Sequence, residues 1–195
     1  MWVAFLLLAL GLSSCVEKRE KPAVEDPYER MFTEDVQGTP RDTLLMGRLG
    51  EDTAMSCLQV ITDSGDTLYV NKTSVDGVEG VMLGDVRNFE DRVMLTAMTD
   101  EEGSLFLQSF LNVSQLEGEW KNEKTQLSLL PDSQVTSTNT SYTHWRLDRC
   151  RLLLIGDHAT EYGTAQHVDT ATIELLDADS LHLTIARHGQ LKLGK

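Results

Sequence analysis

Apolar and polar residues alternate with a period of two along most of the chain after residue 43. In residues 181–185 every second position carries leucine or isoleucine, and histidine and threonine lie between them. This pattern is typical of half-buried β-strands, and no window shows the 3.6-residue period of an amphipathic helix. We therefore expect an all-β protein. The expected strands are residues 44–49, 54–62, 67–71, 92–98, 104–113, 127–129, 142–147, 151–155, 170–175, 181–185 and 191–193.

Turn-forming residues separate these strands and predict two small antiparallel β domains. Aspartate and glycine in residues 63–66 and 100–103 favour tight turns. Residues 44–113 contain a strand–turn–strand opening, a long middle connection and a later pair of strands, which predicts an OB-like barrel or sandwich. Residues 114–195 contain short strands at nearly regular spacing, which predicts an up-and-down meander that closes into a barrel.

The first residues form a separate apolar segment that ends in the run Leu12-Ser13-Ser14-Cys15. This run resembles the lipobox of bacterial lipoproteins, in which the signal is removed before a cysteine that carries lipid. The resemblance implies that residues 1–14 are a signal peptide, that Cys15 is lipidated, and that this lipid anchors the protein in the cell envelope, at the outer membrane. Because residues 1–4 lack the lysine or arginine usual in a signal, a plain secretory peptide is the alternative.

Residues 15–43 are predicted to be the lipid anchor and a flexible tether. They are rich in charge, they hold Pro22, Pro27 and Pro40, and they show no apolar period that could bury a face. The tether would hold the folded part of the protein away from the lipid surface.

The charge balance is acidic and disfavours nucleic acid as a partner. The chain has 17 lysine and arginine residues against 31 aspartate and glutamate residues, a formal net charge of −14. In residues 44–117 the balance is 4 − 13 = −9. Such a segment repels the phosphate backbone of a nucleic acid. The acidic charge favours solubility or the binding of a basic partner.

The second half carries a run of motifs in a characteristic order. Gly118-Glu119-Trp120 opens its first strand, and the segments 142–147, 152–156, 169–176 and 179–183 follow. This succession resembles the lipocalin-like domain of lipoproteins from Bacteroidetes-type bacteria, over residues 112–195. The resemblance implies an abbreviated lipocalin-like barrel whose first strand begins at Gly118. It also implies that Trp120 packs across the closed end of this barrel and that Arg187 stacks on the Trp120 ring.

The length of this half limits what the barrel can hold. Residues 118–195 number 78, which leaves about ten residues for each of eight strands and their turns. Small eight-stranded barrels are filled by their own side chains or hold one small ligand.

No catalytic or metal-binding motif occurs, so we expect no enzyme, no cofactor and no metal site. Asp169 is expected at the lip of a strand without a catalytic role. The five histidines all lie in the second half, and we expect them on the solvated exterior of the barrel. Cys57 and Cys150 lack CxxC spacing; we expect buried free thiols, with a disulfide as the alternative.

Two functions fit these expectations. The first is a lipid-anchored protein that binds or shuttles a small apolar ligand in the lipocalin-like barrel. The second is an interaction module that docks a protein or glycan of the envelope through the acidic residues 44–113. An apolar cavity in the barrel would favour the first, and an exposed apolar patch or open sheet edge on residues 44–113 would favour the second.

Overall fold

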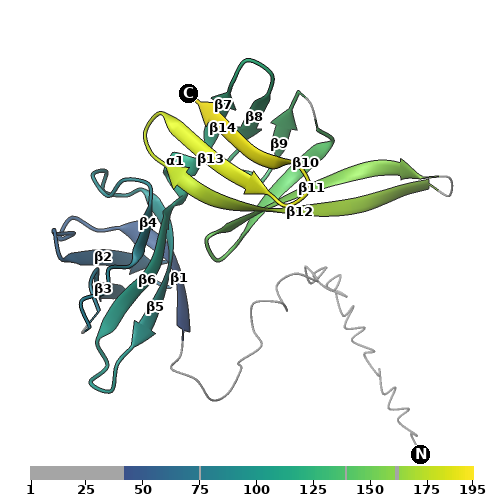
Figure 1. Ribbon diagram of the computed structural model, residues 1–195. Coiled ribbons are helices and arrows are strands. Elements are labelled where there is room, and N and C mark those ends of the chain that lie inside the picture. The colour runs from purple at the N-terminus through teal and green to yellow at the C-terminus, as the bar shows by residue number, and fades with distance from the viewer. Residues whose placement is uncertain (1–41, 75, 139, 161–162) are drawn as a thin grey trace, which may run out of the picture. The chain divides into compact units, whose positions relative to one another are not determined.

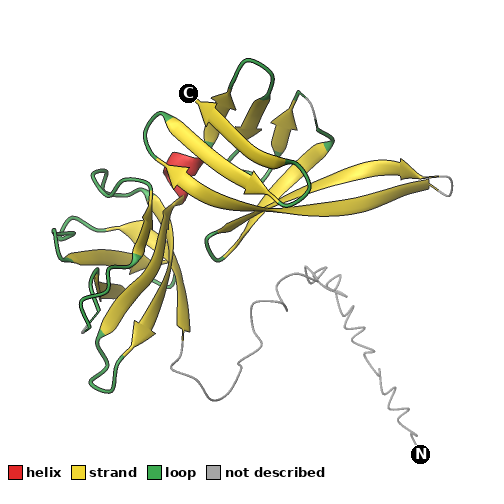
Figure 2. Cartoon of the chain, viewed as in Figure 1, coloured by secondary structure: helices red, strands yellow, loops and turns green. Residues whose placement is uncertain are grey.

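The computed structural model describes residues 42–195 except 75, 139 and 161–162 (Figure 1). The expected signal peptide, the lipidation site Cys15 and all but the end of the expected tether lie outside the described residues. In the described part, strands account for nearly all regular structure (Figure 2), which confirms the expected all-β class.

Six strands form the first sheet: β1 (Asp42–Leu49), β2 (Cys57–Thr62), β3 (Thr67–Asn71), β4 (Val81–Leu83), β5 (Arg92–Thr99) and β6 (Leu105–Asn112). Antiparallel pairing links β3 to β2, β2 to β1, β1 to β5 and β5 to β6. A short parallel pairing of β3 with β6 completes a closed ring of five strands, as expected for an OB-like barrel. Strand β4 adds to β6 at the end of the sheet order.

Eight strands form the second sheet: β7 (Gly118–Lys121), β8 (Gln126–Leu129), β9 (Val135–Ser137), β10 (Tyr142–Asp148), β11 (Arg151–Thr160), β12 (Gly163–Leu176), β13 (Ser180–Ile185) and β14 (Gly189–Gly194). Chain neighbours pair antiparallel from β10 to β14, and β14 then pairs with β7, the first strand. The sheet order begins with β10 and ends with β9. These two strands come close to each other, since the backbone amide of Trp145 in β10 donates to the carbonyl of Ser133, just before β9, at 2.8 Å. The sheet is therefore a nearly closed up-and-down barrel, as expected.

Three elements were not expected from the pattern. One is strand β4, whose three residues are too few for alternation to show. The helix α1 (Val113–Leu116) is a single turn, and the Asn112 side chain caps it by accepting from the Gln115 amide at 2.9 Å. One turn is too short to show a helical period, so its residues were assigned to the preceding strand and to the start of the second domain. Strand β9 has three residues, which is too few for alternation to show. None of the helices in the described part of the chain is long and apolar enough to cross a membrane.

The β11–β12 hairpin is longer than expected. Its two strands pair with each other from Arg151–Thr172 out to Thr160–Gly163, whereas β10 reaches only Gly156 and β13 reaches only Ala171. The outer part of the hairpin therefore runs past its neighbours (Figure 1). Because no further strand covers it, its residues lack the regular alternation by which a strand is detected.

Alternation in β5 distributes side chains between two cores. Val93, Leu95 and Ala97 point into the core of the first barrel. Met94 lies on the opposite face and belongs to the larger cluster that fills the second barrel. The face of β5 on which a side chain lies thus decides the core to which it belongs.

Both cysteines of the described chain are free thiols, in agreement with the first of the two expectations, but each is half-buried and not fully buried. Burial raises the pKa of the Cys57 thiol, and burial also raises the pKa of the Cys150 thiol, against the opposing effect of a hydrogen bond with Ser109. Both therefore resist forming the reactive thiolate at neutral pH.

Candidate functional site at the mouth of the second barrel

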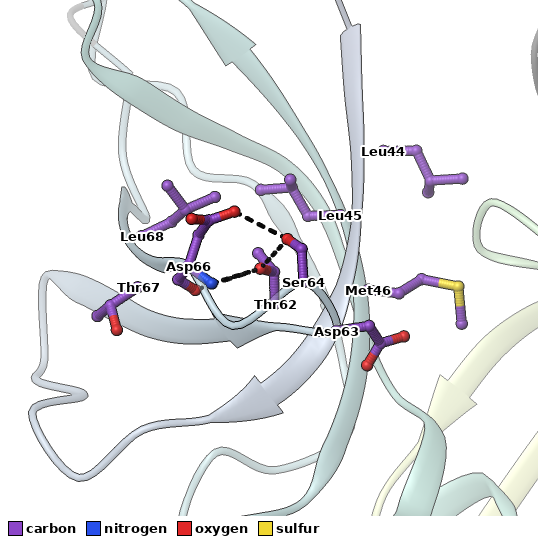
Figure 3. Close-up of a pocket in the computed structure, with 9 residues that line it drawn as sticks. All are labelled: Leu44, Leu45, Met46, Thr62, Asp63, Ser64, Asp66, Thr67 and Leu68. Carbon is purple, nitrogen blue, oxygen red and sulfur yellow. Dashed lines mark hydrogen bonds between the residues drawn. The ribbon is translucent and has the colours of Figure 1, made fainter.

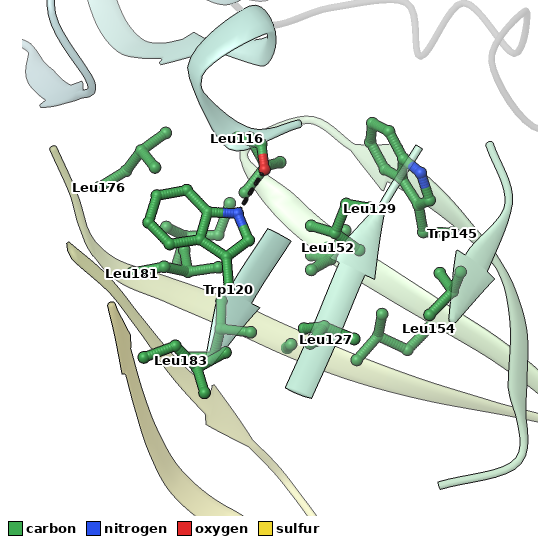
Figure 4. Close-up of a cluster of buried hydrophobic side chains, with 14 of the residues drawn as sticks. Leu116, Trp120, Leu127, Leu129, Trp145, Leu152, Leu154, Leu176, Leu181 and Leu183 are labelled. Atoms are coloured by element: carbon green, nitrogen blue, oxygen red, sulfur yellow. Dashed lines mark hydrogen bonds between the residues drawn. The ribbon is translucent and has the colours of Figure 1, made fainter. Parts of the chain in front are cut away.

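Trp120 lies at one end of the second barrel, next to α1. Its side chain is fully buried, and its indole N–H donates to the Leu116 carbonyl at 2.8 Å (Figure 4). Gly118, two residues earlier, has a φ of +135°, a conformation that favours glycine. This end, where α1 and Trp120 meet, is called the closed end below.

The cation over Trp120 is Lys195 and not the expected Arg187. The Lys195 ammonium nitrogen lies 4.6 Å from the centroid of the indole ring. Arg187 has a side chain that is 71% exposed, and it lies beside Asp169 instead. The reason is that β13 ends at Ile185, so Arg187 lies in the following turn and does not continue the inward face of that strand.

Side chains fill the interior of the second barrel above Trp120. The inward leucines come from three strands, β8, β11 and β13, and each is at most 2% exposed (Figure 4): Leu127, Leu129, Leu152, Leu154, Leu181 and Leu183. A side chain with almost no accessible surface has no space of the size of a water molecule beside it. The interior that these leucines line is therefore a packed core, as small barrels allow.

The opposite end of the barrel, from which the β11–β12 hairpin projects, is called the mouth. The inward positions of this hairpin change from apolar to polar as they approach it. Asp169 is paired across the strands with the buried Leu154, and His167 with Gly156. Residues paired in this way point to the same side of a sheet, so Asp169 and His167 continue the inward face of the leucines.

Asp169 is the centre of a polar cluster at the mouth. Its side chain is only 4% exposed, and Oδ2 accepts a hydrogen bond from the Tyr142 hydroxyl at 2.7 Å. His188 Nε2 lies 3.5 Å and His167 Nε2 lies 4.0 Å from the same oxygen. Arg187 Nε lies 3.6 Å from Oδ1. These groups offset the cost of burying a carboxylate, which is large for an unpaired charge.

Gly156 makes room for this cluster. A Cβ at this position would lie 2.5 Å from the Ser141 carbonyl oxygen and 2.7 Å from His167 Cε1. The His167 ring also contacts the rings of Tyr142 and His158, at centroid distances of 5.7 and 5.6 Å. The absence of a side chain at Gly156 therefore allows three rings to meet at the mouth.

Three buried polar atoms near the mouth have no hydrogen-bond partner: Ser137 Oγ, Thr140 Oγ1 and His167 Nδ1. Ser137 ends β9, and Thr140 lies between β9 and Tyr142, so the first two belong to the connection from β9 to β10. Buried polar atoms are nearly always satisfied in folded proteins. These three atoms are therefore able to bind a water molecule or a polar group of a ligand.

The Tyr142 phenol of this cluster is held in its protonated form. Burial, together with the hydrogen bond to Asp169 and the charge of that carboxylate, raises the pKa of the Tyr142 phenol far above its ordinary value. The phenol thus stays protonated and acts as a donor. Within the residues that the structure describes, no three histidine, cysteine or acidic side chains are placed to hold a metal ion.

The lip of a strand is the place expected for Asp169 from the sequence, but the cluster around it was not predicted. His167 was expected on the exterior, whereas its side chain is 20% exposed and points inward. The available signal was the spacing of His167 and Asp169 from Ala171 and Ile173, which places all four on one face of β12. The contacts with Tyr142 and with the β13–β14 turn depend on which strands lie beside β12 in the sheet.

A second concave region lies on the first barrel. It is a pocket of about 530 Å³ between the start of β1 and the β2–β3 turn, lined by Leu45, Leu68 and polar turn residues (Figure 3). Its two carboxylates have partners: Ser64 donates to Asp66 at 2.8 Å, and Arg92 binds Asp63 at 2.8 and 3.1 Å. None of the described residues that line this pocket carries one of the three unpartnered buried polar atoms.

Comparisons with known proteins relate the second half to a family. A profile of the lipocalin-like family matches residues 112–192. Among solved structures, the chain is similar to a lipocalin-like protein from Bacteroides thetaiotaomicron VPI-5482, with 25% sequence identity and a TM-score of 0.31; the match covers 40% of this chain and 93% of that one. No curated protein matched the sequence. The family match contains the second barrel and supports the expected lipocalin-like domain.

Proposed function

We propose that the protein is a lipid-anchored envelope protein that acts by binding, and that it takes a small ligand at the mouth of its lipocalin-like barrel. The observation that carries this proposal is the set of unpartnered buried atoms Ser137 Oγ, Thr140 Oγ1 and His167 Nδ1 beside the buried Asp169 cluster. A bound polar group would satisfy atoms that the fold leaves without partners.

The packed interior limits the size and the chemistry of this ligand. A lipocalin-like fold is compatible with a small apolar ligand. Here the leucines around Leu154 leave no room beneath Asp169, so an apolar part would have to lie at the rim. We therefore propose a small molecule with one polar group that faces His167 and Ser137, and an apolar part outside the core.

The other parts of the proposal come from the sequence. The run that ends in Cys15 supports a lipid anchor, and hence a place at the envelope membrane; we propose the outer membrane. The mouth cluster pairs no nucleophile with a base, which supports binding without catalysis. The net charge of −14 supports partners other than nucleic acid.

The test is native mass spectrometry of the full chain extracted from its own membranes in detergent. We expect a retained small molecule on the wild-type protein, and we expect Asp169→Asn to lose it, because the amide changes the charge around which His167, His188 and Arg187 gather. The matched control is Glu174→Gln, an exposed position on the same strand, which should retain the molecule.

A second variant protects the test from a folding defect. Ser137→Ala removes an unpartnered hydroxyl, so it should leave the melting temperature of the empty protein nearly unchanged and still weaken retention of the molecule. If the wild-type protein carries no small molecule, or if Ser137→Ala and Asp169→Asn both retain it as well as Glu174→Gln does, the mouth is not the binding site.

A further inference from the structure

The first barrel exposes an open sheet edge with apolar side chains. Strand β4 ends the strand order of its sheet and pairs only with β6 among the described strands. Val81 and Met82 of this strand are 59% and 37% exposed, and Val78, just before it, is 66% exposed. An exposed strand edge carries backbone groups that can pair with another chain, and proteins usually protect such edges with charge or with a cover.

The open stretch has defined limits. Before β4, the Gly80 amide donates to the Lys72 carbonyl at 3.0 Å, and Thr73 is bridged to Glu79, so the preceding segment is already paired. After β4, the Gly84 amide donates to the Leu176 carbonyl at 2.9 Å. The edge that remains open is therefore Val81–Leu83, a short and well-anchored strand.

The segment that carries the edge is acidic in sequence, between Lys72 and Arg87. Residues 73–86 contain three acidic residues and neither lysine nor arginine. Asp76 and Glu79 are exposed, while Asp85 forms an ion pair with Arg87 at 2.9 Å. An apolar edge flanked by acidic side chains favours a partner with apolar and basic side chains, because charge complementarity selects the partner and speeds its association.

We propose that the open edge of β4 pairs with an extended segment of another protein that alternates apolar and basic side chains. The partner backbone would continue the ladder beyond Val81–Leu83, and its side chains would contact Val81 and Met82 and approach Glu79. A second copy of this chain fits less well, since it would place acidic residues opposite acidic residues. A glycan lacks the peptide groups that continue a ladder.

The test uses the full chain in detergent and a fluorescent peptide of alternating lysine and valine, about eight residues long. We expect the peptide to raise its fluorescence anisotropy on binding and to protect the amides of residues 81–83 from hydrogen exchange. Val81→Lys and Glu79→Lys should each weaken binding about tenfold, because each adds a positive charge at the edge. A glutamate–valine peptide should not bind.

The control variant is Val168→Lys, which makes the same substitution at an exposed valine of β12. It should bind the peptide as the wild type does, and so should Asp169→Asn, because the mouth is a separate site. Equal weakening by Val168→Lys, or equal binding of a lysine–valine peptide interrupted by proline, would show charge attraction without strand pairing and overturn the proposal. Self-association of the chain that Val81→Lys abolishes, or displacement of the peptide by a soluble glycan, would overturn it too.

Discussion

At the scale of single residues, buried polar contacts distinguish this protein from a plain apolar barrel. Trp120 donates to the Leu116 carbonyl, and Trp145 donates to the Leu130 carbonyl, each at 2.8 Å. Asp169 is the one acidic side chain found among the buried residues of the described chain. The sequence shows that these residues are present, but it does not show which groups they bind.

The first prediction concerns Trp120. Trp120→Ala should lower the free energy of unfolding by about 3–5 kcal/mol, because it removes a fully buried aromatic side chain. Trp120→Phe keeps most of the volume but leaves the Leu116 carbonyl without its donor, and should lower it by about 1–3 kcal/mol. Urea unfolding measures both. If Trp120→Ala costs under about 1 kcal/mol, Trp120 is not a central part of the core.

The second prediction concerns pH and Glu117. Burial raises the pKa of this carboxyl above its ordinary value, against the lowering effect of the nearby Arg92 charge. A raised pKa means that folding favours the neutral form, so the favourable contribution of Glu117 is complete below its ordinary pKa and is lost as pH rises through the raised value. Glu117→Gln keeps a neutral side chain at every pH, so the variant should be more stable than the wild type near neutral pH.

Urea unfolding at about pH 4 and pH 7 measures this difference, which should nearly vanish at the lower pH. Glu123→Gln is the control, because it removes one negative charge from an exposed position of the same barrel. If Glu117→Gln were less stable than the wild type at neutral pH, or if Glu123→Gln gave the same gain, the cause would not be the burial of Glu117.

At the scale of elements, strand length and termination place the functional groups. Strand β13 ends at Ile185, which moves Arg187 from the barrel interior to the turn beside Asp169. The extension of β11 and β12 past their neighbours brings His158 and His167 together above Gly156. These ends depend on which strands pair, and a single strand pattern does not contain that information.

The third prediction concerns the β11 strand. Gly156→Ala should lower the free energy of unfolding by about 1–3 kcal/mol, because the new methyl group would meet the Ser141 carbonyl oxygen and the His167 ring. The control is Gly194→Ala, whose added carbon would have an ordinary contact of 3.4 Å with the Asp179 carbonyl oxygen. We expect this control to stay within about 0.5 kcal/mol of the wild type in thermal or urea unfolding. Equal effects of the two substitutions would contradict a crowded mouth.

At the scale of the whole molecule, we propose separate roles for a lipid anchor and for the two β-barrels. The anchor would fix the protein to the membrane, the second barrel presents the mouth, and the first barrel presents the edge of β4. Acidic charge is concentrated in the first of the two barrels, with −9 of the −14 between residues 44 and 117. A protein held at a membrane would thus offer its binding surfaces at a distance from the lipid.

The fourth prediction tests the anchor. Cys15→Ser should move the protein from the membrane fraction to the soluble fraction and abolish incorporation of labelled fatty acid, because the thiol is the group that would carry the lipid. Cell fractionation and labelling measure the two effects. Cys57→Ser is the control, since this thiol lies in the folded part of the chain and should leave both unchanged. Unchanged membrane association of Cys15→Ser would rule out the lipid anchor.

The sequence by itself determined the all-β class, most strand positions and the order of the second barrel. Alternation is a local property, so residues 67–71 or 181–185 show it without reference to the rest of the chain. The sequence also determined the charge and the candidate anchor Cys15, which depend on composition and on a short motif.

Only the tertiary structure decided which residues meet. The Lys195 contact with Trp120 and the cluster around Asp169 join segments far apart in the chain, and the open edge of β4 exists because this strand has a partner on one side only. Barrel closure and strand termination create these contacts, and both depend on pairing between strands, which no single segment specifies. The fold was therefore predictable from local patterns, whereas the candidate sites were not.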